Sequence, residues 1–151
     1  INYPLGGYQA EYILDTVRWA VNRKTDLVCT GLPIYWLKSE ELSKLEAFVR
    51  KIYDICQKKP LRIFLETSLL SFEEISTLCN LLTNAGIIHL KTSSGLPHPT
   101  SEDILSFIRS NFPDLLLAVD NNLRGDSPEI DRLFKLGADT VCIKEPWTHH
   151  F

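Results

Sequence analysis

The sequence predicts an α/β protein made of strand-helix units in series, and three observations support this. Short apolar segments begin near residues 26, 61, 87, 115 and 139. Amphipathic segments fill the intervals, whose lengths suit the helix and two short loops of a parallel βαβ unit. The apolar segments are almost continuous, which indicates strands covered on both faces. We expect a parallel (β/α) barrel of the TIM-barrel type. A doubly wound open sheet also fits, but the Gly-x-Gly-x-x-Gly turn usual after its first strand is missing.

The first two helices are predicted from their apolar stripes. Residues 10–21 carry apolar side chains at helical spacing, after a turn at residues 4–7. The second helix is expected to begin at Ser39 as its N-cap and to end before Pro60. Its stripe comprises Leu45, Phe48, Val49, Ile52 and Cys56.

The last three helices are predicted from the signals at their ends. The segment 71–74, Ser-Phe-Glu-Glu, is a capping box, and Gly86 is a left-handed C-cap of the same helix. The next helix is expected over about 102–111. The last begins at Ser127-Pro128, with a cap and a proline at the first helical position, and ends at Gly137.

A clipped strand is expected before the first helix, so about six of the eight strand-helix units of a closed barrel are represented. Such a piece leaves two parallel edges open, which proteins normally cover or pair. Either the sequence lacks residues of a longer protein, or another chain supplies the missing strands, or the chain is a truncated pseudoenzyme. Open edges also favour self-association into a homo-oligomer.

The composition indicates one globular domain, a partial barrel that we expect to span residues 1–151. The chain is 44% hydrophobic and 23% charged, with a net charge of −3. Its basic residues are scattered among acidic ones, which argues against nucleic acid as a partner. No apolar stretch approaches the roughly 18 residues of a membrane span. The widely spaced cysteines form no Cys-x-x-Cys pair, so reduced thiols and a cytoplasmic location are expected.

Polar side chains end or follow each predicted strand, where ligands of this fold class bind. They are Thr30, Glu66, Lys91, Asp120 and Lys144-Glu145. Lys91 is the sharpest candidate for catalysis. A lysine held at the mouth of an apolar barrel loses hydration, its pKa falls, and the neutral amine can attack a carbonyl group.

The segment after this lysine reads Lys91-Thr92-Ser93-Ser94-Gly95, in which hydroxyls and a flexible glycine suit a phosphate or hydroxyl beside the amine. It resembles the Lys-Thr-Ser-Thr-Gly motif that carries the Schiff-base lysine of the deoxyribose-phosphate aldolases. Further segments resemble that family in the same order along the chain: Tyr3-Pro4-Leu5-Gly6, Asp26-Leu-Val and Leu65-Glu66-Thr67-x-Leu69-Leu70.

The resemblance implies a class I aldolase, in which Lys91 forms an imine with a small aldehyde or ketone. The reaction would be reversible aldol cleavage of a small sugar, phosphorylated or not. The resemblance also implies proton transfer assisted by Asp26, and no metal or organic cofactor. Substrate contacts are expected from Thr92, Ser93, Ser94, Gly95, Glu66, Asp120, Asn121 and Asn122.

The chain departs from the family at two strands. The family carries a second lysine in a Lys-x-x-Gly-Gly motif, whereas this chain reads Ala118-Val119-Asp120-Asn121-Asn122. On the last strand, Cys142-Ile143-Lys144 replaces a Gly-x-Ser phosphate contact. Lys144 is a candidate second amine, because two strand spacings of about 4.8 Å place its backbone roughly 10 Å from that of Lys91. It could equally hold an anion or be solvated.

Two other functions stay open at this point. A catalytically silent barrel, kept as a binding or assembly module, predicts an ordinary lysine pKa and no imine. A metal-dependent enzyme would hold a divalent cation through carboxylates, and its activity would be lost to chelators but indifferent to Lys91→Ala. The carboxylates in question are Glu66, Asp26, Asp120 and Glu145.

Overall fold

The structure is a computed structural model that describes residues 1–2, 7–57, 59–95, 98–125 and 127–143. Strands and helices alternate along the chain, as the sequence predicts. None of the helices in these ranges is long and apolar enough to cross a membrane. In order, the elements are α1 (Ala10–Val21), β1 (Val28–Gly31), α2 (Tyr35–Lys38), α3 (Leu42–Cys56), β2 (Leu61–Phe64), the 3-10 helix η1 (Thr67–Leu69), α4 (Phe72–Asn84), β3 (His89–Lys91), α5 (Glu102–Asn111), β4 (Leu116–Leu123), α6 (Glu129–Lys135) and β5 (Thr140–Ile143).

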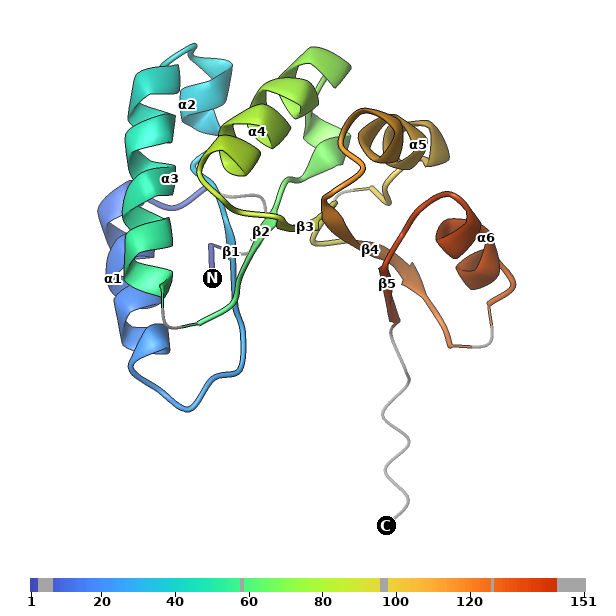
Figure 1. The fold of residues 1–151 in the computed structure, drawn as a ribbon, viewed down its shortest axis with the longest axis horizontal. Helices are drawn as coiled ribbons and strands as arrows, with labels where there is room; N and C mark the ends of the chain where they lie inside the picture. Colours follow the sequence, from blue (N-terminus) through green and yellow to red (C-terminus); the bar gives the residue numbers. More distant parts are fainter. Residues whose placement is uncertain (3–6, 58, 96–97, 126, 144–151) are drawn as a thin grey trace.

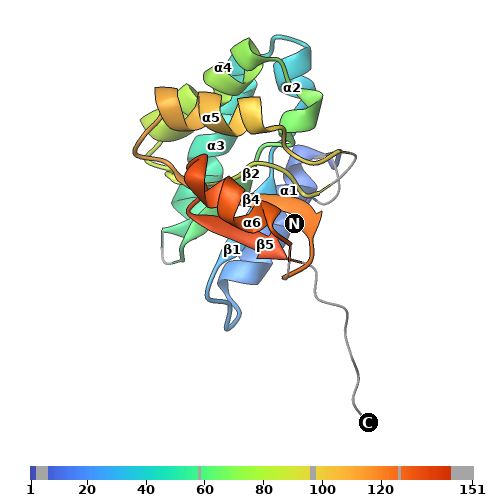
Figure 2. The ribbon, with the colours of Figure 1, turned by 90° about the vertical axis from the view of Figure 1, so that its right-hand side faces the viewer.

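The strands form one sheet in the order β1-β2-β3-β4-β5, and every neighbouring pair is parallel. The helices surround this arc of strands on its outer side (Figure 1). Figure 2 shows the β5 end of the sheet, with α6 beside it. Helices would cover both faces of a doubly wound sheet. Sequential strand order with the helices on one face is instead the arrangement of a (β/α) barrel, and the described strands form an open part of one.

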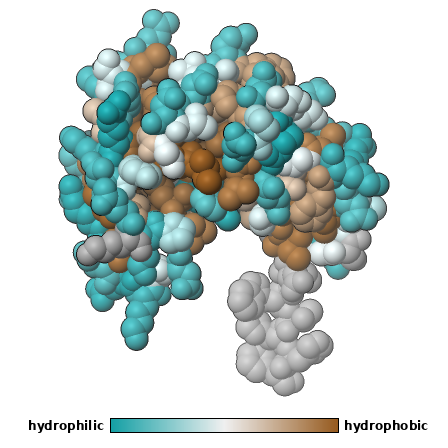
Figure 3. Space-filling view, viewed as in Figure 1, coloured by the Kyte–Doolittle hydropathy of each residue, from teal (hydrophilic) through white to brown (hydrophobic). Residues whose placement is uncertain are grey.

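Alternate side chains of each strand face opposite sides of the sheet. One set is wholly buried against the helices and includes Ile63, Leu65, Leu90, Leu117 and Val119. The other set faces the concave side of the arc, where the space-filling view shows the molecule hollowed between two arms (Figure 3). This concave side is named the lumen face here. By their place in the register, its residues include Cys29, Arg62, Phe64, His89, Lys91, Ala118 and Asp120.

The clipped strand expected before α1 is represented by Ile1. Its backbone nitrogen donates a hydrogen bond to the Cys29 carbonyl at 2.8 Å, and its carbonyl accepts one from the Gly31 nitrogen at 3.1 Å. Two such bonds, on either side of Thr30, are the pattern of a parallel pair. A sixth strand position therefore borders β1. The turn predicted at residues 4–7 lies mostly outside the described residues.

Most of the local signals at the helix ends hold. The Ser71 hydroxyl accepts from the Glu74 nitrogen at 3.2 Å and the Glu74 carboxylate accepts from the Ser71 nitrogen at 2.8 Å, which confirms the capping box. Gly86 has the left-handed φ of 82° expected of it.

Pro128, predicted at the first helical position after a Ser127 cap, is itself the N-cap of α6, which begins at Glu129. The prediction that Ser39 opens a helix is wrong. Ser39 closes the short α2, because its hydroxyl donates to the Tyr35 carbonyl one turn earlier, at 2.8 Å.

A single guanidinium joins α5 to the turn between α6 and β5. Arg109 donates to the Gly137 carbonyl from two nitrogens, at 2.9 and 2.6 Å. It also donates to the carbonyls of Pro113 and Leu115, at 2.6 and 2.9 Å, and pairs with Asp139 at 2.6 Å. Because these acceptors come from segments far apart in the sequence, Arg109 fixes the last strand-helix unit to the one before it.

We expect Arg109→Ala to lower the free energy of unfolding by about 2–3 kcal/mol, since hydrogen bonds to charged groups contribute roughly 1.5–3 kcal/mol and their partners stay desolvated. Urea unfolding followed by circular dichroism measures the change. Arg50→Ala is the matched control: Arg50 forms an exposed pair with Glu46 on α3, and its loss should cost at most about 0.5 kcal/mol. Equal losses in the two variants would contradict the role given to Arg109.

Candidate active site around Lys91

Lys91 is the last residue of β3 and lies at the centre of the sheet. Its register partners are Phe64 on β2 and Ala118 on β4, and Gly31 of β1 is level with Phe64. A Cβ atom on Gly31 would lie 2.4 Å from the Phe64 ring, so glycine is needed there for the ring to fit on the lumen face. The Lys91 side chain is 19% exposed. The sequence thus places one amine on the lumen face, at the carboxyl ends of the strands.

The Lys91 amine forms an ion pair with Asp120. Its Nζ atom lies 2.9 Å from Asp120 Oδ2, and the Asp120 side chain is 12% exposed. Burial by itself lowers the pKa of Lys91, but the hydrogen bond and negative charge of Asp120 outweigh it, so the pKa is raised above its usual value. The depressed pKa that the sequence suggested is therefore wrong, because the acid two residues after Ala118 stabilises the ammonium form.

An irregularity in β4 aims the side chains that follow Asp120. Asp120 pairs with Cys142, but the next pair is Leu123 with Ile143, so residues 121–122 bulge from the ladder. Asn122 has a φ of 57°, a left-handed conformation that asparagine tolerates better than most residues. β4 therefore continues to Leu123, beyond Asp120, the residue expected at its end, and brings both asparagines to the site.

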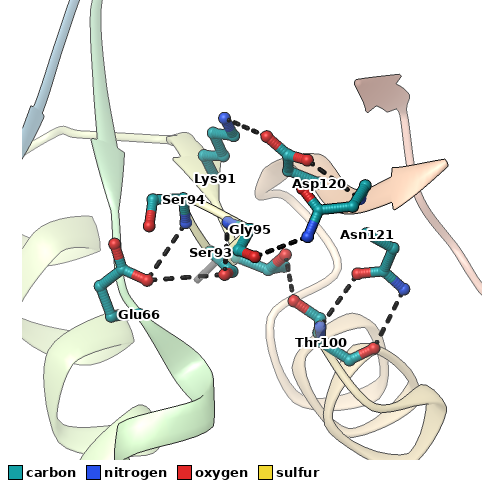
Figure 4. A network of polar contacts seen from close by, with 10 residues as sticks. Glu66, Lys91, Ser93, Ser94, Gly95, Thr100, Asp120 and Asn121 are labelled. Carbon is teal, nitrogen blue, oxygen red and sulfur yellow. Dashed lines mark hydrogen bonds and ion pairs between the residues drawn. The ribbon is translucent and has the colours of Figure 1, made fainter. Parts of the chain in front are cut away.

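Asp120 lies close to Gly95 in the loop after β3 (Figure 4). Asn122 approaches the same glycine. The Asn122 amide nitrogen donates to the Gly95 carbonyl at 2.7 Å. Gly95 has a φ of 87°, and a Cβ atom there would lie 2.8 Å from Asn122 Oδ1 and 3.2 Å from Asp120 Oδ1. Both the backbone conformation and the close approach require glycine at this position.

The loop after Lys91 also rests on a buried carboxyl group. Glu66 is 1% exposed, follows β2 and has a left-handed φ of 55°. Its Oε2 atom accepts from the Ser94 nitrogen at 3.1 Å and from the Ser93 hydroxyl at 3.5 Å. Glu66 Oε1 and the Ser94 hydroxyl are buried without a hydrogen-bond partner. Two oxygen atoms beside the loop thus have unused hydrogen-bonding capacity, although neither is exposed in this conformation.

Buried threonines connect the loops beneath the site. The Thr100 hydroxyl donates to the Thr92 hydroxyl at 2.7 Å and lies 3.4 Å from that of Thr67. The Thr100 backbone nitrogen donates to Asn121 Oδ1 at 2.9 Å, and its carbonyl accepts from Asn121 Nδ2 at 3.2 Å. Asn121 therefore ties the loop that leads to α5 onto β4. Thr92 and Asn121 are thus hydrogen-bonded within the protein, and the substrate contact expected of each stays a prediction.

Asp26 lies away from Lys91. It is exposed and precedes β1, five residues before Gly31. At about 3.3 Å per residue, it lies roughly 16 Å toward the amino ends of the strands from the level of Lys91. The proton-transfer role implied for Asp26 has no support in this geometry. The β1 residue that shares the lumen face with Lys91 is Cys29, a half-buried thiol whose pKa is raised by burial.

The remaining predictions concern Lys144 and Glu145, a metal site, and the cysteines. Lys144 and Glu145 lie outside the described residues. Among the described residues, no group of three or more histidine, cysteine, aspartate or glutamate side chains is placed to hold a metal ion. All four cysteines are unpaired thiols, as expected.

Sequence reasoning missed Thr100, Cys29 and Arg62. Thr100 follows a proline in a loop, where no pattern indicates that it is buried and hydrogen-bonded to several residues. Strand alternation puts Cys29 and Arg62 on the face opposite the core, but only the register shows that they share that face with Lys91. The Arg62 Nε atom is buried without a partner.

We expect Asp120→Asn to lower the pKa of Lys91, since burial remains while the stabilising charge is removed. Competitive acetylation across a pH series, read by peptide mass spectrometry, measures this. Lys38, exposed and paired with Glu74, is the control within the same chain and should not change. The pKa of Lys91 is higher in the folded protein than in the unfolded chain. The charged amine therefore contributes fully to the free energy of unfolding below the unfolded-state pKa, and this contribution is lost as the pH rises through the folded-state pKa. An unchanged Lys91 pKa in the variant would contradict the assignment.

No protein-family model matches the chain. Solved structures do match it. An aldolase named QR15 has a TM-score of 0.86 at 21% identity, over 95% of this chain and 65% of its own. A putative deoxyribose-phosphate aldolase from Coccidioides immitis has a TM-score of 0.85 at 19% identity, over 93% and 57%. The deoxyribose phosphate aldolase of Aeropyrum pernix, a tetramer, has a TM-score of 0.78 at 18% identity, over 95% and 61%. The chain therefore has the fold of the deoxyribose-phosphate aldolases, as its motifs predicted, and spans less than two thirds of the length of each of these three proteins.

Proposed function

We propose that the site performs class I aldolase chemistry, in which Lys91 forms an imine with a small carbonyl compound. The observation that carries the proposal is the position of the Lys91 amine. It lies on the lumen face at the end of the central strand, 2.9 Å from the Asp120 carboxylate that can receive its proton. The reaction proposed is reversible aldol cleavage of a small sugar, with no metal or organic cofactor.

The proton of the Lys91 ammonium passes to Asp120, and the neutral amine adds to the substrate carbonyl carbon. Loss of water from the resulting carbinolamine gives an iminium ion. The bond between the α and β carbons then breaks, and its electron pair forms the enamine. A base removes the proton of the β-hydroxyl group, which becomes the carbonyl of the departing aldehyde. Protonation of the enamine carbon and addition of water release the second product and restore the lysine. Asp120 thus replaces Asp26 as the proposed proton-transfer group.

The ion pair between Lys91 and Asp120 affects how imine formation depends on pH. Since Asp120 raises the pKa of Lys91, little of the amine is neutral near pH 7, and imine formation should accelerate as the pH rises toward that pKa. Ala118 occupies the position where the family resemblance places a second lysine, so the positive charge that would lower the pKa is missing there.

A catalytically silent binding module is the second candidate, and the same ion pair favours it. A lysine whose charge is satisfied by a buried carboxylate is stable as an ammonium ion. The metal-dependent alternative has no support within the described residues, which contain no metal-binding cluster. A cytoplasmic location and a homo-oligomer remain predictions; the Aeropyrum pernix protein is tetrameric.

We expect sodium cyanoborohydride with small, uncharged aldehydes to leave a reduced adduct on Lys91 that increases with pH. Intact-protein and peptide mass spectrometry measure its position and yield. Lys91→Ala should abolish this adduct, whereas the matched variant Lys38→Ala, which removes an exposed lysine of α2, should retain it.

Labelling of Lys91 no faster than that of Lys38 across the pH series, in correctly folded protein, would contradict aldolase chemistry and support the silent module. The comparison is made within one digest, so differences in protein concentration or reagent do not affect it. Circular dichroism of each variant establishes that the fold is retained.

A further inference from the structure

We propose that Asp120 and Asn122 close the space over Gly95 to anions, so that the site takes uncharged hydroxylated carbonyl compounds and rejects phosphorylated ones. The inference rests on the proposed function of Lys91 and specifies its substrate class. It assigns Asp120 and Asn122 as specificity determinants, and three separate features of the site support it.

The first feature is steric. The Asn122 side chain is fixed over Gly95 by its 2.7 Å hydrogen bond to the Gly95 carbonyl. The space that a Cβ atom on Gly95 would enter is already bounded by Asn122 Oδ1 at 2.8 Å and Asp120 Oδ1 at 3.2 Å. A phosphate group is far larger than a methyl group, so it does not fit against this glycine while both side chains keep their positions.

The second feature is that three backbone amides around Gly95 are already used. Loops bind phosphate by directing free N–H groups at its oxygens. Here the Ser94 nitrogen donates to Glu66 at 3.1 Å and the Gly95 nitrogen to the Ser93 hydroxyl at 2.8 Å. The Asn122 nitrogen donates to Asp120 Oδ1 at 3.3 Å. Each acceptor is a side chain of the site itself, so an anion would have to displace it.

The third feature is charge. The ammonium of Lys91 is neutralised by Asp120, and Glu66 adds a second buried carboxyl group on the other side of the loop. Another cation of the lumen face, Arg62, is level with His89, two residues before the level of Lys91 and roughly 7 Å toward the amino ends of the strands. A phosphate beside Gly95 would therefore contact the negative end of the ion pair.

Glu66 Oε1 and the Ser94 hydroxyl lie beside this loop and are buried without partners, so neither is exposed to an anion. A carboxylate oxygen can only accept hydrogen bonds, whereas a hydroxyl both donates and accepts them. If the loop moves to expose these atoms, an uncharged substrate hydroxyl satisfies both without bringing in negative charge. A short hydroxyaldehyde or hydroxyketone matches these requirements.

Reductive trapping with glycolaldehyde and with glycolaldehyde phosphate, at equal free-aldehyde concentrations, tests the inference. We expect Lys91 to label at least about tenfold faster with glycolaldehyde, after normalisation to Lys38 in the same digest, because a like charge in contact with Asp120 is disfavoured. Asp120→Ser/Asn122→Gly should bring the ratio toward one. Asn122→Gly alone keeps the left-handed conformation and should shift the ratio part of the way, whereas Asn22→Gly, at the exposed end of α1, should leave it unchanged.

A second experiment needs no imine. Inorganic phosphate is titrated into isotope-labelled protein, and NMR follows the backbone amide signals of residues 92–95. The parent protein should show no saturable shift in these signals. A saturable shift would overturn the inference. So would a preference for glycolaldehyde over glycolaldehyde phosphate that is no greater at Lys91 than at Lys38. If neither aldehyde labels Lys91, the proposed function fails, and the phosphate titration alone decides whether the loop excludes anions.

Discussion

Ile63, Leu65, Leu90, Leu117 and Val119 are wholly buried between the sheet and its helices, and the other contacts depend on this packing. Burial of each such side chain contributes about 1.5–3 kcal/mol, so the face that meets the helices is strongly specified. Because side chains alternate along a strand and the register of parallel neighbours is shared, the remaining side chains must face the lumen in matched levels. Lys91 lies on the lumen face for that reason.

On this face, electrostatics decide the state of the amine. The Lys91–Asp120 pair is largely buried, where a charge without a partner is costly and a paired one is tolerated. The carboxylate of Asp120 stabilises the ammonium form of Lys91, whose proton imine formation must remove, yet it can also accept that proton through their hydrogen bond. The same contact therefore slows the formation of the neutral amine and also supplies a route for its proton to leave. For this reason both proposed functions arise from one ion pair.

The bulge in β4 links this ion pair to the loop that follows Lys91. Asn121 hydrogen-bonds to Thr100, Asn122 hydrogen-bonds to Gly95, and Asp120 accepts from the Asn122 nitrogen. Backbone conformations of low population, such as the left-handed Glu66 and Asn122, cluster at the same place. The surrounding hydrogen bonds hold these residues there, and the amide groups that a looser loop would offer to a ligand are occupied within the protein.

The sequence by itself determined the strand-helix order, most helix ends and Lys91 as the central candidate, because hydrophobic periodicity, capping residues and a local motif are properties of short segments. The Ser39 prediction failed where two local signals competed, since serine can bond to the carbonyl one turn earlier as readily as it can cap a helix. Only the tertiary structure decided that Asp120 and not Asp26 faces Lys91, and that Asn121 and Asn122 both hydrogen-bond to the connection between β3 and α5. These contacts join residues far apart in sequence through strand register and a bulge, and neither has a local pattern from which to predict it.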